Sequence, residues 1–154
     1  MGQTFGLLIL CIILGGLIQY IISYKSGISL NMTDSCPIIE FTNENKDLLF
    51  LLDTGADISY ISVNALPGLR YKPIQSLGNT FAGANSAEKI LGWINLNFHY
   101  RDKEFNDNFA VINMEGTAAL FKDNRALDGI LGSQFLANYE SMIDIKNQLF
   151  YPEL

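Results

Sequence analysis

The chain has 154 residues, of which 49% are hydrophobic and 17% are charged, and its formal net charge is -6. This composition excludes collagen-like and disordered chains, and the acidic balance disfavours a nucleic-acid partner. The length allows one core-bearing domain. Cys11 and Cys36 are too few for a disulfide framework and form no CxxC pair, and the chain has one His, so we expect neither a metal site nor a cofactor.

The N-terminal segment, residues 1–24, contains no charged side chain. Residues 5–24 would form a helix about 30 Å long, the hydrocarbon thickness of a bilayer, so we predict a single-pass transmembrane helix. A cleaved signal peptide is the alternative, but the segment lacks a basic n-region and a clean cleavage site. Lys25, the only basic residue beside the span, favours the cytoplasmic side for the rest of the chain. One lysine does not determine the orientation, which the sequence leaves open.

Short apolar runs alternate with turn residues over residues 36–154, after a polar linker at residues 25–35. This pattern is typical of an all-β domain. The run LLFLL at 48–52 is apolar on both faces, which favours a strand buried on both sides. Strands are predicted at 36–41, 48–52, 58–63, 93–100, 105–112, 129–132, 141–145 and 148–151.

A hairpin and one helix complete the predicted elements. Residues 79–90 suit a hairpin, and its tip would be formed by Gly83, Ala84 and Asn85. Near the C-terminus, Ser133 is expected to cap one short helix over residues 133–139. The domain is therefore predicted to contain mostly strands and a single short helix.

The chemically most informative stretch is Asp53-Thr54-Gly55-Ala56-Asp57, directly after the buried strand. A carboxylate at the exit of such a strand, followed by a hydroxyl and a glycine, is placed where side chains meet a cleft and the backbone turns tightly. Asp, Thr and Gly are also common turn formers, so a plain strand-to-turn corner is the alternative interpretation.

The order of these motifs resembles that of the retroviral-type aspartic proteases, the retropepsins, and of their cellular and bacterial relatives. The specific parts are LLFLLDTGAD at 48–57 and DGILG at 128–132, and the resemblance extends over about residues 37–151. It implies a closed β-barrel of the retropepsin type with one short C-terminal helix. It also implies an aspartic endopeptidase that cleaves polypeptides as a homodimer joined through chain-terminal strands, here residues 149–154.

The resemblance further implies that each chain supplies one catalytic Asp and that the symmetric partner supplies the second. Two carboxylates about 3 Å apart cannot both ionise, so the pair shares a proton, and one acts as base toward water while the other acts as acid. Asp53 would be the catalytic residue, supported by Thr54 and Gly55. The substrate-binding residues would be Ala56, Asp57, Gly83, Ala84 and Asn85.

One departure from the viral pattern concerns Asp57. Viral enzymes have Arg-Asn after the glycine that ends the second apolar strand, and that Arg pairs with the acid of the motif region. Here Ser133-Gln134 follow Gly132, so the sequence identifies no partner for Asp57. Two other acids, Asp128 and Asp144, lie in a predicted turn and a predicted strand and are expected to be structural.

Two other classes of function stay open from the sequence. A catalytically silent module that keeps the fold would dimerise or bind peptides on its membrane anchor. A β-rich envelope domain with a chance Asp-Thr-Gly would be monomeric, and replacing Asp53 would change no activity. The intact motif favours the enzyme over both alternatives.

Overall fold

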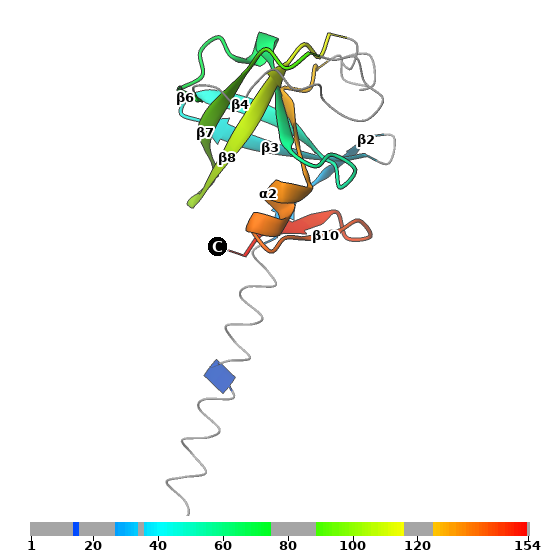
Figure 1. Ribbon diagram of the computed structural model, residues 1–154. Coiled ribbons are helices and arrows are strands. Elements are labelled where there is room, and N and C mark those ends of the chain that lie inside the picture. The colour runs from blue at the N-terminus through cyan, green and yellow to red at the C-terminus, as the bar shows by residue number, and fades with distance from the viewer. Residues whose placement is uncertain (1–13, 16–26, 34–35, 75–88, 116–124, 154) are drawn as a thin grey trace, which may run out of the picture.

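A computed structural model describes residues 14–15, 27–33, 36–74, 89–115 and 125–153 (Figure 1). In chain order the elements are β1 (Ile28–Ser29), β2 (Asn31–Thr33), β3 (Cys36–Asn43), β4 (Lys46–Leu52), β5 (Ser59–Ser62), the 3-10 turn η1 (Val63–Ala65), β6 (Tyr71–Ile74), β7 (Gly92–Tyr100), β8 (Lys103–Ile112), β9 (Gly129–Leu131), α2 (Ser133–Asn138), β10 (Met142–Asp144) and β11 (Leu149–Tyr151). The predicted all-β domain with one short C-terminal helix is confirmed.

Six strands close into a barrel. The large sheet has the order β2-β3-β4-β9-β5-β8-β7-β6, and a pairing of β3 with β7 at Thr42 and His99 joins its two halves. The pairs β4–β9 and β5–β8 are parallel, whereas the other neighbours in this sheet are antiparallel. The closed ring therefore runs β3-β4-β9-β5-β8-β7. Outside the ring, β2 pairs with β3 and β6 pairs with β7.

Phenylalanine rings fill the barrel because inward side chains alternate with outward ones along each strand. Six of them are almost completely buried: Phe41, Phe50, Phe98, Phe105 and Phe109 on the strands, and Phe135 on α2. Contacting pairs have ring centroids 5.0 to 6.2 Å apart, the range in which aromatic pairs add to simple area burial. In β4, Leu48, Phe50 and Leu52 face this core while Leu49 and Leu51 join a second apolar cluster, so the predicted doubly buried strand is confirmed.

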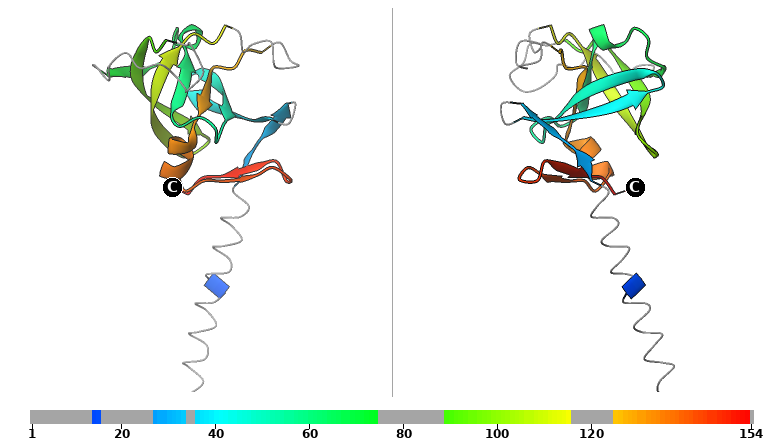
Figure 2. Two further views of the ribbon diagram at one scale, coloured as in Figure 1. Left: turned by 45° about the vertical axis from the view of Figure 1, so that its right-hand side comes forward. Right: turned by 180° about the vertical axis from the view of Figure 1, so that it is seen from behind.

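A second, three-stranded sheet with the order β1-β11-β10 lies beneath the barrel, on the side of α2 (Figure 2). Ile28 and Phe150 are paired across β1 and β11, and both are fully buried. The sheet thus packs the start and the end of the domain against the main core.

The predicted linker at residues 25–35 is wrong in its central part. Residues 28–33 form β1 and β2, which pair with β11 and β3. The physical reason is that this stretch carries apolar side chains at alternate positions: Ile28 and Leu30 enter the main core, and Met32 packs against it. The folded domain therefore begins earlier in the chain than residue 36.

The predicted membrane span, residues 5–24, lies outside the described residues apart from Leu14 and Gly15. In the part of the chain that the structure describes, no helix combines the length and the apolar character needed to cross a membrane. The predicted hairpin tip, residues 83–85, also lies outside the described residues.

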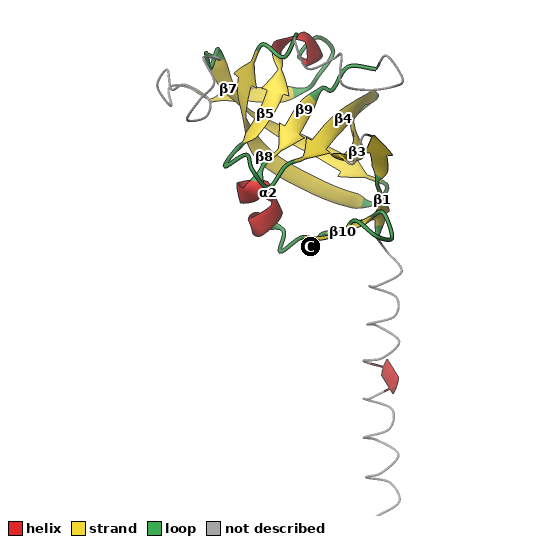
Figure 3. Cartoon of the chain, turned by 90° about the vertical axis from the view of Figure 1, so that its right-hand side faces the viewer, coloured by secondary structure: helices red, strands yellow, loops and turns green. Residues whose placement is uncertain are grey.

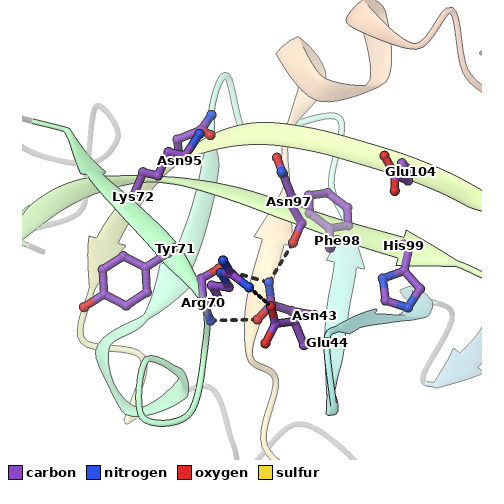
Figure 4. A pocket seen from close by; sticks show the side chains of 10 residues that line it. All are labelled: Asn43, Glu44, Arg70, Tyr71, Lys72, Asn95, Asn97, Phe98, His99 and Glu104. Carbon is purple, nitrogen blue, oxygen red and sulfur yellow. Dashed lines mark hydrogen bonds and ion pairs between the residues drawn. The ribbon is translucent and has the colours of Figure 1, made fainter.

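A side-chain amide completes the barrel where backbone pairing is interrupted (Figure 4). Along β7, β6 pairs with residues Trp93 to Leu96 and β3 pairs with His99, which leaves a notch beside Asn97. The buried Asn43 fills it. Its Nδ2 donates to the carbonyl oxygens of Asn97 at 2.7 Å and Arg70 at 3.1 Å, and its Oδ1 accepts the Arg70 N–H at 2.9 Å.

Candidate active site

The parallel pairing of β4 and β9 sets the position of Asp53. Leu52 and Leu131 are register partners, and the Asp53 N–H donates to the Leu131 carbonyl oxygen at 3.0 Å. Parallel strands have their carboxyl ends at the same edge, so the loop after β4 and the helix after β9 begin side by side (Figure 3). This pairing brings the Asp53 loop and the start of α2 together.

The Asp53 side chain is half-buried and fixed by its own loop. Its Oδ1 accepts the Gly55 N–H at 2.8 Å, while the Asp53 carbonyl oxygen accepts the Ala56 N–H at 3.2 Å. A Cβ atom on Gly55 would lie 3.1 Å from the same Oδ1, tighter than ordinary packing allows. Gly55 therefore lets the backbone donate to the carboxylate at close range. Thr54 and Gly55 are both exposed in the single chain.

The far side of the loop is held by the first residues of α2. The Ser133 N–H donates to the Ala56 carbonyl oxygen at 2.7 Å, and the Gln134 N–H donates to that of Asp57 at 3.1 Å. The Ser133 hydroxyl also reaches the Asp57 carbonyl oxygen at 3.3 Å. Asp57 thus has a partner after all, but it is engaged through its main chain. Its carboxylate is exposed and forms no ion pair within the described residues.

Two polar residues that the sequence reading missed lie behind this loop. Ser59 on β5 is 2% exposed; its Oγ accepts the Gly132 N–H at 3.2 Å and donates to Oδ2 of Asp107 at 2.5 Å. Burial raises the pKa of Asp107, against the opposing effect of hydrogen bonds from Ser59 and from the Asn108 N–H. A signal was present in the sequence, because Asp107 occupies an inward position in the alternating run that begins at Phe105.

An apolar surface adjoins the loop on the face opposite the phenylalanine core. Leu51 on β4 and Tyr60 on β5 are both register partners of Ile130 on β9, and all three side chains are half-buried. They pack against the second apolar cluster. The carboxylate of Asp53 therefore stands at the edge of a surface that offers partly exposed apolar side chains.

The remaining predicted residues form two groups: two acids with structural roles, and three residues outside the described part of the chain. Asp128 is structural, since its Oδ2 accepts the Leu49 N–H at 2.9 Å. Asp144 is structural as well, because it accepts the N–H and the side-chain amide of Asn147 at 3.0 and 2.7 Å, and these bonds lower its pKa. Gly83, Ala84 and Asn85 lie outside the described residues, so their place near Asp53 stays a prediction.

These features define a structural class: a closed β-barrel that presents an Asp-Thr-Gly carboxylate on a loop held by hydrogen bonds from both sides. The family model of the retroviral aspartyl protease matches residues 33–144. The chain belongs to this family, and the resemblance predicted from its motifs is confirmed. No curated protein matches the chain.

Solved structures give the same fold. The retropepsin-like aspartic protease from Rickettsia conorii has 22% identity and a TM-score of 0.53, with 82% of this chain and 89% of that chain covered. EIAV protease complexed with the inhibitor HBY-793 has 17% identity, a TM-score of 0.53 and coverages of 72% and 94%. The retroviral protease-like domain of Ddi1 from Leishmania major has 16% identity, a TM-score of 0.54 and coverages of 81% and 88%.

Proposed function

We propose that this protein is an aspartic endopeptidase that cleaves polypeptides with a water molecule activated by two Asp53 carboxylates, one from each protomer of a homodimer. The observation that carries the proposal is the Asp53 loop, which is bonded to β9 on one side and to the start of α2 on the other. Such a loop holds a carboxylate in one orientation without any ligand, which is the preorganisation that catalysis requires.

The chemistry needs the second carboxylate because a single Asp cannot act as base and acid in the same step. Two carboxylates about 3 Å apart share one proton, so the ionised member takes a proton from water while the protonated member donates to the peptide carbonyl oxygen. A symmetric dimer places such a pair on its two-fold axis. The exposure of Thr54 and Gly55 in the single chain supports an interface at this position.

The substrate in this proposal is an extended polypeptide. The main chain of Ala56 and Asp57 would bind its backbone, and the apolar surface of Leu51, Tyr60 and Ile130 would receive its side chains. Gly83, Ala84 and Asn85 would close over the substrate as a hairpin tip and exclude water. Neither a metal nor a cofactor takes part in this reaction.

The dimer would also use the three-stranded sheet, but by an edge other than the one the sequence suggested. The sequence predicts that residues 149–154 join the partner, yet β11, which begins this stretch, is central and is paired on both sides, with β1 and β10. An edge strand is the part of a sheet that can add a further strand. We therefore assign the contact to β10, where Met142 is 51% exposed.

The anchor would hold this dimer at a membrane through residues 5–24, with the domain on the cytoplasmic side. Two residues, Lys25 and Ser26, separate the predicted span from Gly27, and Ile28 is already fully buried. Such a short connection would keep the domain at the membrane surface. Confinement to a surface raises effective concentration and so favours dimerisation.

The decisive experiment is cleavage of a diverse peptide mixture by the full chain in detergent or nanodiscs, from acid to neutral pH, with products identified by mass spectrometry. The control is Asp53→Asn, which keeps the size of the side chain but removes the ionisable carboxyl. Cuts that disappear in the variant support the endopeptidase. Cuts that persist overturn it, and a folded dimer that makes no cuts supports the catalytically silent peptide-binding module instead.

A further inference from the structure

A charged residue points into the barrel close to the active-site loop. Asp107 is placed on β8 between two inward side chains, Phe105 and Phe109, which are 2% and 0% exposed. A carboxylate among aromatic core residues is costly unless it is well hydrogen-bonded. The hydrogen-bond partners of Asp107 must therefore offset this cost.

The direction of the hydrogen bonds around Asp107 is fixed by chemistry. The Gly132 N–H can only donate, so Oγ of Ser59 accepts from it, and the one hydroxyl hydrogen of Ser59 is free to be given to Asp107. Asp107 also accepts the Asn108 N–H. Hydrogen bonds from these two donors favour the carboxylate form, whereas burial opposes it.

The chain of bonds continues from Gly132 into the catalytic loop. The next two amides, those of Ser133 and Gln134, donate to the carbonyl oxygens of Ala56 and Asp57. Gly132 itself is tightly enclosed, since a Cβ atom there would lie 2.8 Å from the Ala56 carbonyl oxygen. Asp107 is thus connected to the loop through Ser59 and one short backbone segment.

The other groups that face Asp107 carry no charge. Its register partner on β7 is Leu96, and the next inward residue on β5 is Ile61. Beyond α2, Tyr139 contributes a hydroxyl, which bonds to the backbone of Asn106. Among the described residues, no Lys or Arg forms an ion pair with Asp107.

We propose that Asp107 is a positioning residue, whose carboxylate orients the Ser59 hydroxyl and, through it, the Gly132–Gln134 segment that holds the catalytic loop. The proposal rests on the function proposed above and adds a dependence of the activity on the charge of Asp107. Asp107 does not touch the substrate, and its effect reaches the reaction only through the loop.

The pH dependence separates this role from simple stabilisation. Because burial raises the pKa of Asp107, its contribution to stability is greatest when it is protonated and is lost as pH rises through the folded-state pKa. The positioning role has the opposite dependence, because it needs the carboxylate and grows over the same range. Stability and activity are therefore expected to change in opposite directions with the charge of Asp107.

The first test compares kcat/KM for a peptide that the wild type cleaves, measured with the full chain between about pH 3.5 and pH 7. Asp107→Asn is neutral throughout, so it should match the wild type at the acid end and fall at least about tenfold below it at the neutral end. Asp107→Ala should be impaired at every pH. Asp102→Asn, an exposed acid in the same hairpin, should follow the wild type.

The ratio of wild type to Asp107→Asn cancels every effect of pH that the two proteins share. A ratio that rises with pH supports the positioning role. A ratio that is constant across the range, including one that stays near unity, overturns it, because a merely structural residue would lower activity by the same factor at each pH.

A second test needs no catalysis. Hydrogen exchange at neutral pH should show at least about fivefold lower protection of the Gly132, Ser133 and Gln134 amides in Asp107→Asn and in Ser59→Ala. The Leu91 amide, which bonds to the Val111 carbonyl oxygen on the same sheet, should be unchanged and shows that the barrel is folded. Unchanged protection of Gly132 overturns the inference. Reduced protection in a chain that cleaves nothing supports the hydrogen-bond connection and overturns only the proposed function.

Discussion

Replacing Asn43 tests whether one amide completes the barrel. The side chain is 3% exposed and makes three hydrogen bonds, to the Asn97 carbonyl oxygen and to both polar groups of the Arg70 backbone. Asn43→Ala removes all three and leaves the Asn97 oxygen without this donor. The unpaired Asn97 oxygen costs about 1–3 kcal/mol, and the two lost Arg70 bonds cost only about 0.5–1 kcal/mol each because the Arg70 groups are close enough to the surface to recover water, so we expect a loss of about 2–5 kcal/mol.

The measurement is thermal or denaturant unfolding of the full chain in detergent, with Asn45→Ala as the matched control in the same turn, where the side chain is exposed. A loss of this size lowers Tm by about 5–15 °C in a domain of this length. Asn43→Asp gives a pH-dependent version, since its second oxygen would face two carbonyl oxygens. That repulsion raises the pKa of the new acid, so the variant is closest to wild type in acid and loses stability as pH rises. An Asn43→Ala variant within about 0.5 kcal/mol of wild type would refute the reasoning.

Three further predictions concern the loop, a turn and the dimer. Gly132→Ala should destabilise the domain by about 2–4 kcal/mol and abolish cleavage, because its Cβ atom would collide with the Ile58 carbonyl oxygen; Gly92→Ala, with open space around it, is the control in unfolding and activity assays. Asp144→Asn should lower Tm above about pH 4 and lose its effect as pH falls through the lowered pKa of Asp144, a difference that melting curves at several pH values would reveal. Met142→Asp should leave monomer stability unchanged and weaken self-association measured by sedimentation.

The strands that the sequence predicted correctly are those whose burial follows a simple period. Residues 93–100 alternate in hydrophobicity and form most of β7, residues 105–112 form most of β8, and the doubly apolar run at 48–52 is the end of β4. In contrast, β6 was missed because Tyr71, Lys72 and Pro73 give no apolar pattern. It is an edge strand, where Pro and exposed polar side chains are tolerated, so periodicity carries no information there.

The sequence predicts the motif of the site but not the hydrogen bonds that support it. Residue type and order alone identify Asp53, Thr54 and Gly55 as candidate site residues. The support of Asp57 does not, because Gln134 binds it through backbone atoms, and any residue except proline could supply that N–H group. The viral pattern points to an arginine side chain, whereas the contact here uses backbone atoms and has no side-chain signature.

In the second motif, Gly129-Ile130-Leu131-Gly132, close packing requires both glycines. A Cβ atom on Gly129 would lie 2.7 Å from the Phe50 ring, and one on Gly132 would collide with the backbone of the Asp53 loop. Both glycines therefore allow β9 and the start of α2 to lie against β4 and its loop. Asp-Thr-Gly supplies the carboxylate, and this glycine pair supplies the close fit that keeps it in place. A chance Asp-Thr-Gly would have no reason to be accompanied by these two glycines at matching positions, which is why the pair of motifs indicates the site more strongly than either motif alone.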